Sequence, residues 1–118
     1  MSGIAPSNQI VTRASRQRSK MSRLEAMTLT IEHNAAASRF ETTVDGSRCV
    51  ADYVLAGTTL TLHHTEVPPS LAGRGIAAAL VAEALAHARR EGWRVRPTCS
   101  YVASYMQRHP ETLDLLDT

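Results

Sequence analysis

The sequence predicts an α/β domain of the α+β kind, with a mixed but mostly antiparallel sheet of about five strands. Residues 28–67 alternate between apolar and polar side chains in short runs separated by turn residues, as antiparallel strands do. An amphipathic helix follows over residues 75–92, and a short strand at 93–98 then leads into a second helix. Helices are therefore expected after the fourth and fifth strands.

The first four strands are expected to form a meander. Their predicted ranges are Thr28–His33, Ser38–Val44, Arg48–Leu55 and Thr58–Val67. Asp45-Gly46, between the second and third strands, is the strongest hairpin signal because both turn positions favour positive φ. Alternation along the fourth strand places Leu60, Leu62, His64 and Glu66 on one face.

The first helix carries one apolar stripe, and Gly92 suits its C-terminal cap. The fifth strand, Trp93–Thr98, completes a crossover that makes the fourth and fifth strands parallel neighbours. Ser100 is expected to cap a second helix through about Arg108, and Pro110 to open a final short helical turn. The stripe of the first helix consists of Ile76, Leu80, Val81, Ala84, Leu85 and Ala88.

Length and charge divide the chain into a tail and one domain. The 118 residues have room for one core, but residues 1–26 hold five basic side chains against one acidic, a net charge of +4. These residues show no helical or strand period, so we expect a disordered basic tail at 1–26 and the folded domain at 27–118. The native start is left open among Met1, Met21 and Met27.

Composition excludes several classes of protein. No run of 18 apolar residues is present, and no apolar segment follows the basic N-terminus, so neither a membrane partner nor secretion is expected. Cys49 and Cys99 cannot make a disulfide scaffold and are expected to be reduced thiols, which predicts a cytoplasmic location. Aromatic residues make up 4% and residues 27–118 carry a net charge of −2, so the folded part is not expected to bind nucleic acid.

The loop Ser70–Gly75 has the chemistry of an anion site. It leads a strand into a helix N-terminus, where the N–H groups are unpaired and the helix dipole is positive. Gly73 and Gly75 lack the Cβ atoms that would block a phosphate, and Arg74 can bind one in a bidentate manner. A Walker loop and a dinucleotide-binding fingerprint both fit badly, because the only lysine is Lys20 and the loop follows the fourth strand of a meander.

The segment Ala72-Gly73-Arg74-Gly75-Ile76-Ala77 resembles the Gln/Arg-x-x-Gly-x-Gly/Ala motif of the GNAT superfamily, the acyl-CoA-dependent N-acetyltransferases. Ala72 stands where that family usually has Gln or Arg. The flanking HTEVPP and the later CSYVASYMQRHPE resemble a branch of minimal single-domain GNAT-like proteins, and the resemblance covers residues 28–116.

This resemblance implies a GNAT-like fold with acetyl-CoA as co-substrate. The diphosphate is expected on the backbone amides of the glycine loop, and the pantetheine arm between the fourth and fifth strands. The acyl thioester is then expected near His64, Glu66 and Cys99. The cofactor-binding residues that it implies are Glu66, Val67, Ala72, Gly73, Arg74, Gly75, Ile76 and Ala77.

Acyl transfer to an amine needs a base and an acid. His64 and Glu66 are the candidate bases, although a buried histidine and a solvated strand-end charge are the structural alternatives. Cys99, just before a helix N-terminus, is a candidate nucleophile or proton donor, and otherwise a small buried residue. Tyr101 and Tyr105 are further candidate acids that the resemblance does not separate. The histidine and cysteine spacings predict no metal site.

The leading hypothesis is an N-acyltransferase that moves acetyl from acetyl-CoA to the amine of a small molecule or peptide. Compared with the longer GNAT proteins that it resembles, the chain is expected to lack the N-terminal helical pair that usually covers their acceptor site. An open acceptor pocket, or one completed by a second subunit in a homodimer, is therefore expected. The alternatives are a non-catalytic CoA-binding or protein-interaction module, and a nucleic-acid-associated protein that uses the basic tail.

Overall fold

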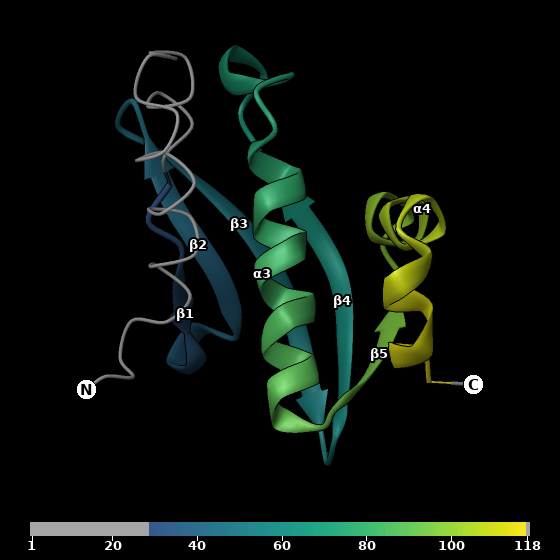
Figure 1. Ribbon diagram of the computed structural model, residues 1–118. Coiled ribbons are helices and arrows are strands. Elements are labelled where there is room, and N and C mark those ends of the chain that lie inside the picture. Colours follow the sequence, from purple (N-terminus) through teal and green to yellow (C-terminus); the bar gives the residue numbers. More distant parts are fainter. Residues whose placement is uncertain (1–28, 118) are drawn as a thin grey trace.

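The computed structural model describes residues 29–117. They form a five-stranded sheet in the order β1-β2-β3-β4-β5, with one long helix, α3, across one face (Figure 1). The strands are β1 (Glu32–Asn34), β2 (Arg39–Val44), β3 (Ser47–Ala56), β4 (Thr59–Glu66) and β5 (Arg94–Pro97). The helices are α3 (Ile76–Glu91) and α4 (Ser100–Arg108), with 3₁₀ turns η1 (Ala35–Ala37), η2 (Pro69–Leu71) and η3 (Pro110–Leu115).

The meander and the crossover are both confirmed. β1 to β4 pair antiparallel in sequence order, and β4 pairs parallel with β5 through α3. Asp45 and Gly46 have φ of 51° and 79°, so the β2–β3 hairpin has the predicted left-handed turn. The predicted apolar stripe of α3 is buried along its whole length against the sheet. Across residues 29–117, no helix has the length and apolar character needed to cross a membrane.

The first strand is shorter than predicted. Its ladder begins at Glu32, although Leu29 and Ile31 are buried as strand alternation requires, and Thr28 lies outside the described residues. The ladder begins with the pair of Glu32 and Glu41, and the Glu41 carboxylate accepts a hydrogen bond from Arg39 of its own strand at 2.7 Å. Beyond that pair the segment separates from β2 and leaves a polar hollow of about 200 Å³.

The predicted face of β4 is wrong, because the strand contains one extra residue. Asp52 of β3 pairs with His64, whereas the next residue, Tyr53, pairs with Leu62, so His63 has no counterpart on β3. Such a bulge reverses the alternation of side chains beyond it. His64 therefore lies on the face opposite Leu62, together with Glu66. Thr65, which pairs with the fully buried Ala51, lies on the face of α3 instead.

Helix α4 spans the predicted residues but is capped differently. Its N-cap residue is Cys99, not Ser100, and no side chain accepts a hydrogen bond from its first turn. Pro110 opens η3 as predicted. The C-terminal segment then joins the sheet edge, because the N–H of Asp117 donates to the carbonyl of Val95 at 2.9 Å.

Candidate functional site

Strands β4 and β5 diverge at the bulge. Their ladder ends with the Leu62–Pro97 pair, and the N–H groups of Thr98 and Cys99 both donate to the Leu62 carbonyl at 3.1 Å. β4 continues as far as Glu66, so four residues of its β5-facing edge run on past the end of the ladder. The two strands thus open a wedge whose closed end is Leu62.

A pocket of about 310 Å³ lies beside this wedge, at the N-terminus of α3. It brings together the end of β4, the glycine loop, the first turn of α3 and one tyrosine of α4. Its lining residues are Val67, Leu71, Ala72, Gly73, Gly75, Ile76, Ala77, Ala78 and Tyr101. Six of the eight predicted cofactor-binding residues line it, while Glu66 and Arg74 lie outside the lining.

The N-terminus of α3 is arranged to receive an anion. Gly75 is the N-cap residue with φ 79°, and no side chain caps the first-turn N–H groups. Those groups point toward the pocket end of the helix, where the dipole is positive. Gly73 has φ 82°, a conformation that side chains with a Cβ rarely adopt, and a Cβ there would meet nothing within 4 Å. The glycines therefore set the turn of the loop and leave space beside it.

Arg74 is held at the rim of the loop. Its Nη1 donates to the Asp45 carboxylate of the β2–β3 turn at 3.1 Å. Asp45 is two-thirds exposed, so the ion pair is weak and leaves other guanidinium donors for a phosphate. The hairpin turn thus orients the one cation of the loop.

Cys99 lies where the wedge meets α4. Its backbone is extended at the N-cap position, and its Sγ lies 3.9 Å from Oγ1 of Thr65. The bulge in β4 brings this threonine to the thiol by turning it toward the face of α3. Cys49, in contrast, is fully buried in the core, and burial raises the pKa of its thiol.

His64 and Glu66 form an exposed pair on the opposite face of the sheet. His64 Nε2 lies 3.3 Å from Glu66 Oε1, and the two side chains are 50% and 69% exposed. Asp52 lies directly across the ladder from His64. Neither predicted base is buried, so an amine approaching this face of β4 meets both groups in solvent.

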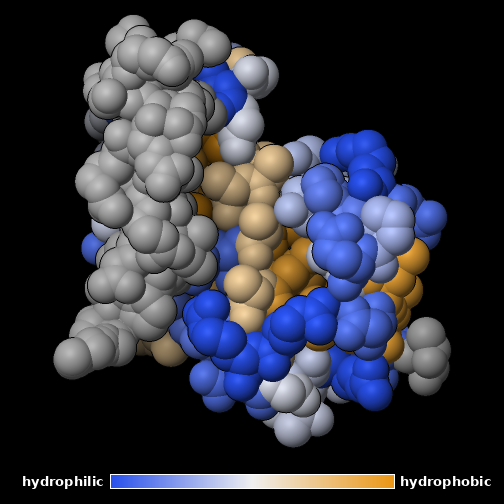
Figure 2. All heavy atoms as spheres, viewed as in Figure 1, coloured by the Kyte–Doolittle hydropathy of each residue, from blue (hydrophilic) through white to orange (hydrophobic). Residues whose placement is uncertain are grey.

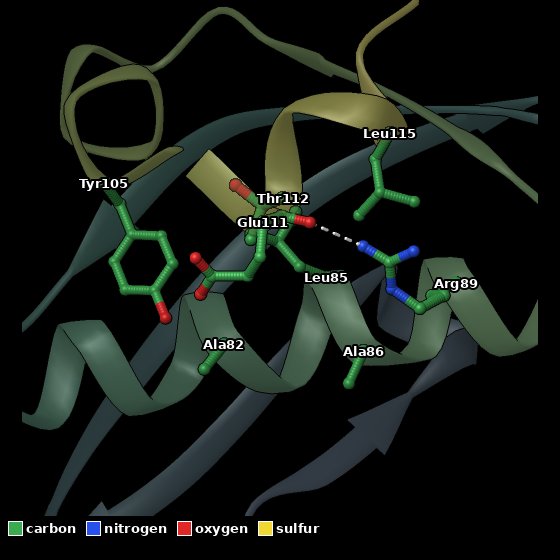
Figure 3. A pocket seen from close by; sticks show the side chains of 8 residues that line it. All are labelled: Ala82, Leu85, Ala86, Arg89, Tyr105, Glu111, Thr112 and Leu115. Atoms are coloured by element: carbon green, nitrogen blue, oxygen red, sulfur yellow. Dashed lines mark hydrogen bonds between the residues drawn. The ribbon is translucent and has the colours of Figure 1, made fainter. Parts of the chain in front are cut away.

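The two tyrosines of α4 line different hollows. Tyr101 lines the pocket at the glycine loop. Tyr105 is buried one turn later, where its ring stacks on His109 with centroids 4.0 Å apart, and burial raises the pKa of its hydroxyl. It lines a second hollow between α3, α4 and η3 (Figure 3). The placement favours Tyr101 for chemistry at the wedge.

Comparisons with known proteins agree with this geometry. A family model described as GCN5-related N-acetyl-transferase matches residues 39–115, more than half of the chain. The chain belongs to the GCN5-related N-acetyltransferase (GNAT) family. It is 34% identical over 83 residues to Protein NATD1 of Xenopus tropicalis and of Mus musculus, which covers 68% of this chain and 76% of each relative. Protein NATD1 of Danio rerio is 32% identical over 85 residues, covering 70% and 77%.

Three residues of this GNAT site were missed from the sequence. Leu71 and Ala78 line the pocket on either side of the predicted loop residues, and extending the motif by one residue in each direction would have found them. Thr65 comes to Cys99 through the bulge, which no glycine or proline of β4 signals. Within residues 29–117 the GNAT domain groups no three His, Cys, Asp or Glu side chains in a way that could hold a metal ion.

Proposed function

We propose that this protein is an acyl-CoA-dependent N-acyltransferase that transfers acetyl from acetyl-CoA to an amine. The observation that carries the proposal is the pocket that joins the uncapped N-terminus of α3 to the wedge between β4 and β5. One end of this pocket suits a diphosphate and the other is lined by Tyr101, while Cys99 lies at the closed end of the neighbouring wedge, where its N–H donates to Leu62. In this proposal the protein works in the cytoplasm, where free thiols such as those of Cys49 and Cys99 stay reduced.

The chain offers contacts for the diphosphate and for the pantetheine arm of coenzyme A. The first-turn amides of α3 and the guanidinium of Arg74 would hold the diphosphate. The β5-facing edge of β4 at Glu66 and Val67 would pair with the amides of the pantetheine arm, as an added strand does. Leu71 and Ile76, both buried at the pocket wall, would cover its apolar atoms.

The residues at the wedge divide the proton transfers between them. Bound acetyl-CoA supplies an activated thioester carbonyl. Glu66, directly or through His64 and water, would accept the proton that the amine loses as its nitrogen attacks that carbonyl. As the carbon–sulfur bond breaks, Cys99 or Tyr101 would give a proton to the departing sulfur. The products are the acetylated amine and free CoA. A covalent variant, in which the Cys99 thiolate attacks first and the amine then takes the acetyl group, is the alternative route.

A non-catalytic CoA-binding or protein-interaction module is the second candidate. The exposure of His64 and Glu66 favours it, because catalytic bases usually work in a site that excludes water. A homodimer whose second subunit covers this face would reconcile that exposure with catalysis. Measuring thiol release from acetyl-CoA in the presence of an amine distinguishes the enzyme from the non-catalytic module.

The first experiment is a ligand titration. Thermal unfolding is followed with CoA, acetyl-CoA, ATP and NAD, and we expect only the first two to raise the melting temperature. Thiol release from acetyl-CoA is then measured against a panel of polyamines, aminoglycosides, amino acids and peptides. Binding without release identifies the module, and the absence of any CoA effect at millimolar concentration contradicts the proposal.

A matched pair of variants tests the position of the diphosphate. Ala77→Glu places a carboxylate in the first turn of α3, where it stabilises the helix but repels the phosphates. Ala77→Gln has the same shape without the charge. We expect CoA affinity to fall by about tenfold or more in Ala77→Glu relative to Ala77→Gln, with the folded state of Ala77→Glu at least as stable as that of Ala77→Gln. Equal affinities would contradict this placement.

A further inference from the structure

A second hollow of about 230 Å³ lies between α3, α4 and η3, and no residue lines both it and the pocket at the glycine loop. The surface view shows an apolar strip over α3 that deepens on the side of α4 and η3 (Figure 2). Small side chains of α3, Ala82 and Ala86, form one wall, and Leu85 and Leu115 form the floor. The hollow is therefore apolar inside and open to a small molecule.

One buried polar group faces this hollow without a partner. Tyr105 is 8% exposed, and within residues 29–117 its hydroxyl makes no hydrogen bond. Figure 3 shows the ring descending from α4 with its hydroxyl toward Ala82 of α3. A buried hydroxyl without a hydrogen bond costs free energy that a ligand could recover.

The charges at the rim select the sign of that ligand. Arg89 is already engaged, because both of its Nη atoms donate to Asp114 at 2.9 Å and Nη2 also donates to the Glu111 carbonyl. The Glu111 carboxylate makes no hydrogen bond or ion pair within the described part of the chain. Glu111 also acts electrostatically on Tyr105, so the two groups lie close together. Arg108 acts on Tyr105 with the opposite sign, but its Nη1 donates to Ser104 Oγ at 3.3 Å. The rim therefore offers an incoming ligand the exposed Glu111 carboxylate beside the neutral Tyr105 hydroxyl, and this pair favours a cation.

We propose that this hollow binds a small amine with a short apolar body, in addition to the acyl-transfer site. The ammonium group would donate to the Glu111 carboxylate and the Tyr105 hydroxyl, and the apolar body would lie on Ala82, Ala86 and Leu115. The hollow has a volume of about 230 Å³. Sites for drug-sized ligands have volumes of about 300–1,000 Å³, so this hollow takes only a smaller molecule. The site lies beyond the proposed acetyl transfer, since it shares no lining residue with the pocket at the glycine loop.

The test uses phenethylamine as the probe on the full chain, with and without saturating CoA. Binding is followed by calorimetry and by the amide resonances of Ala82, Ala86 and Thr112. We expect saturable one-to-one binding in both conditions, with 3-phenylpropionate, an anion with a similar body, bound about tenfold more weakly or not at all. Phenethyl alcohol, which lacks the charge, should bind with intermediate affinity.

Three variants locate the probe. Glu111→Gln removes the rim charge and Ala82→Leu fills the hollow, and each should weaken phenethylamine binding by about tenfold. Glu91→Gln, an exposed glutamate at the far end of α3, is the matched control and should leave affinity unchanged.

The proposal would be overturned if phenethylamine binding did not saturate, or if 3-phenylpropionate bound with equal affinity. It would also be overturned if phenethylamine affinity were unchanged in both Glu111→Gln and Ala82→Leu. Displacement of phenethylamine by CoA would also overturn it, by assigning the probe to the acyl-transfer site. Failure of the acetyltransferase proposal is seen separately, as a lack of CoA binding in the titration.

Discussion

Cys99 combines three features that bear on its reactivity. It ends the segment after β5, begins α4 as its N-cap, and lies 3.9 Å from the Thr65 hydroxyl. A helix N-terminus favours a thiolate, and a hydroxyl nearby can donate to it. The same thiol therefore suits proton donation to a leaving sulfur and nucleophilic attack on a thioester.

Substitutions at Cys99 separate these two roles. Cys99→Ala should slow thiol release from acetyl-CoA by about 100-fold or more, because a general acid contributes about 10²–10⁴-fold. Cys99→Ser, which keeps a proton donor, should recover part of that rate. Intact-mass analysis after mixing with acetyl-CoA alone shows an acetyl adduct on the wild-type chain only if the covalent route operates. An unchanged rate in Cys99→Ala would exclude both roles.

Glu66 is the residue proposed to accept the proton of the amine. Glu66→Gln removes the proton acceptor without changing the size of the side chain, so kcat/KM for the amine should fall by about 100-fold, with CoA affinity nearly unchanged. Glu32→Gln, on a strand three positions away in the sheet, is the control and should keep full activity. Wild-type activity in Glu66→Gln would assign the base to another group.

At the scale of elements, the bulge in β4 decides which side chains meet. The strand itself, its length and its partners could be predicted, because they follow from apolar alternation and from turn residues such as Asp45-Gly46. The extra residue, His63, could not be predicted, because a bulge that contains no glycine leaves no local sequence pattern. This single extra residue exchanges the two faces of the strand for every residue beyond it. His64 and Glu66 were thus predicted on the wrong face, and their role as candidate bases stays a prediction.

Deleting His63 tests the role of the bulge. The β3–β4 ladder would then be regular throughout, so the sheet should still form, as far-ultraviolet circular dichroism would show. The wedge, however, depends on the change of direction at this point, and we expect acetyl transfer to fall by about tenfold or more. Replacing the residue without removing it, as in His63→Gln, should leave activity intact. Full activity after the deletion would show that the wedge does not need the bulge.

Helix α3 is held to the sheet by its apolar stripe, and Leu80 is fully buried at its centre. Leu80→Ala should lower the free energy of unfolding by about 2–5 kcal/mol, because it leaves a cavity that neighbours fill only in part. Urea denaturation measures this loss. The exposed Thr43→Ala should change stability by less than about 0.5 kcal/mol.

At the scale of the whole molecule, a cluster of aromatic and imidazole rings packs the C-terminal half of α3 against β1–β3. The His33 and His87 rings lie 4.5 Å apart between centroids, and His33 Nε2 lies 2.6 Å from the Tyr53 hydroxyl. Phe40 stacks on His33, and Trp93 lies beside His87. Three strands and one helix thus meet at two titratable rings.

These two histidines predict how stability depends on pH. Burial lowers the pKa of both, the charge of His87 lowers that of His33 further, and Arg90 does the same for His87, while Glu91 opposes both shifts. The unfolded chain therefore binds protons first, near pH 6.5, so stability is complete above that pH and falls as the pH drops below it.

We expect the melting temperature to decrease between pH 7 and pH 5, measured by calorimetry. His87→Gln should flatten this dependence, whereas the exposed His63→Gln should leave it unchanged. A dependence that persists undiminished in His87→Gln would contradict the assignment to the ring cluster.

The architecture could be predicted because its parts agree with one another. Turn residues, apolar stripes and the crossover rule all specify one mixed sheet, and the glycine loop places the pocket at one end of it. Tyr101 and Tyr105 could not be distinguished, since both occupy the same stripe of α4 and only the packing of η3 separates them. The basic tail at 1–26 lies outside the described residues and stays a prediction.

Helix α4 supplies a side chain to each hollow: Tyr101 to the one proposed for acyl-CoA and Tyr105, one turn further on, to the one proposed for an amine. Any movement of this nine-residue helix on binding one ligand would change the space available to the other. Thermodynamic linkage makes such crosstalk mutual: the factor by which an amine changes the affinity for CoA must equal the factor by which CoA changes the affinity for the amine. The two titrations proposed for this chain therefore yield one shared constant.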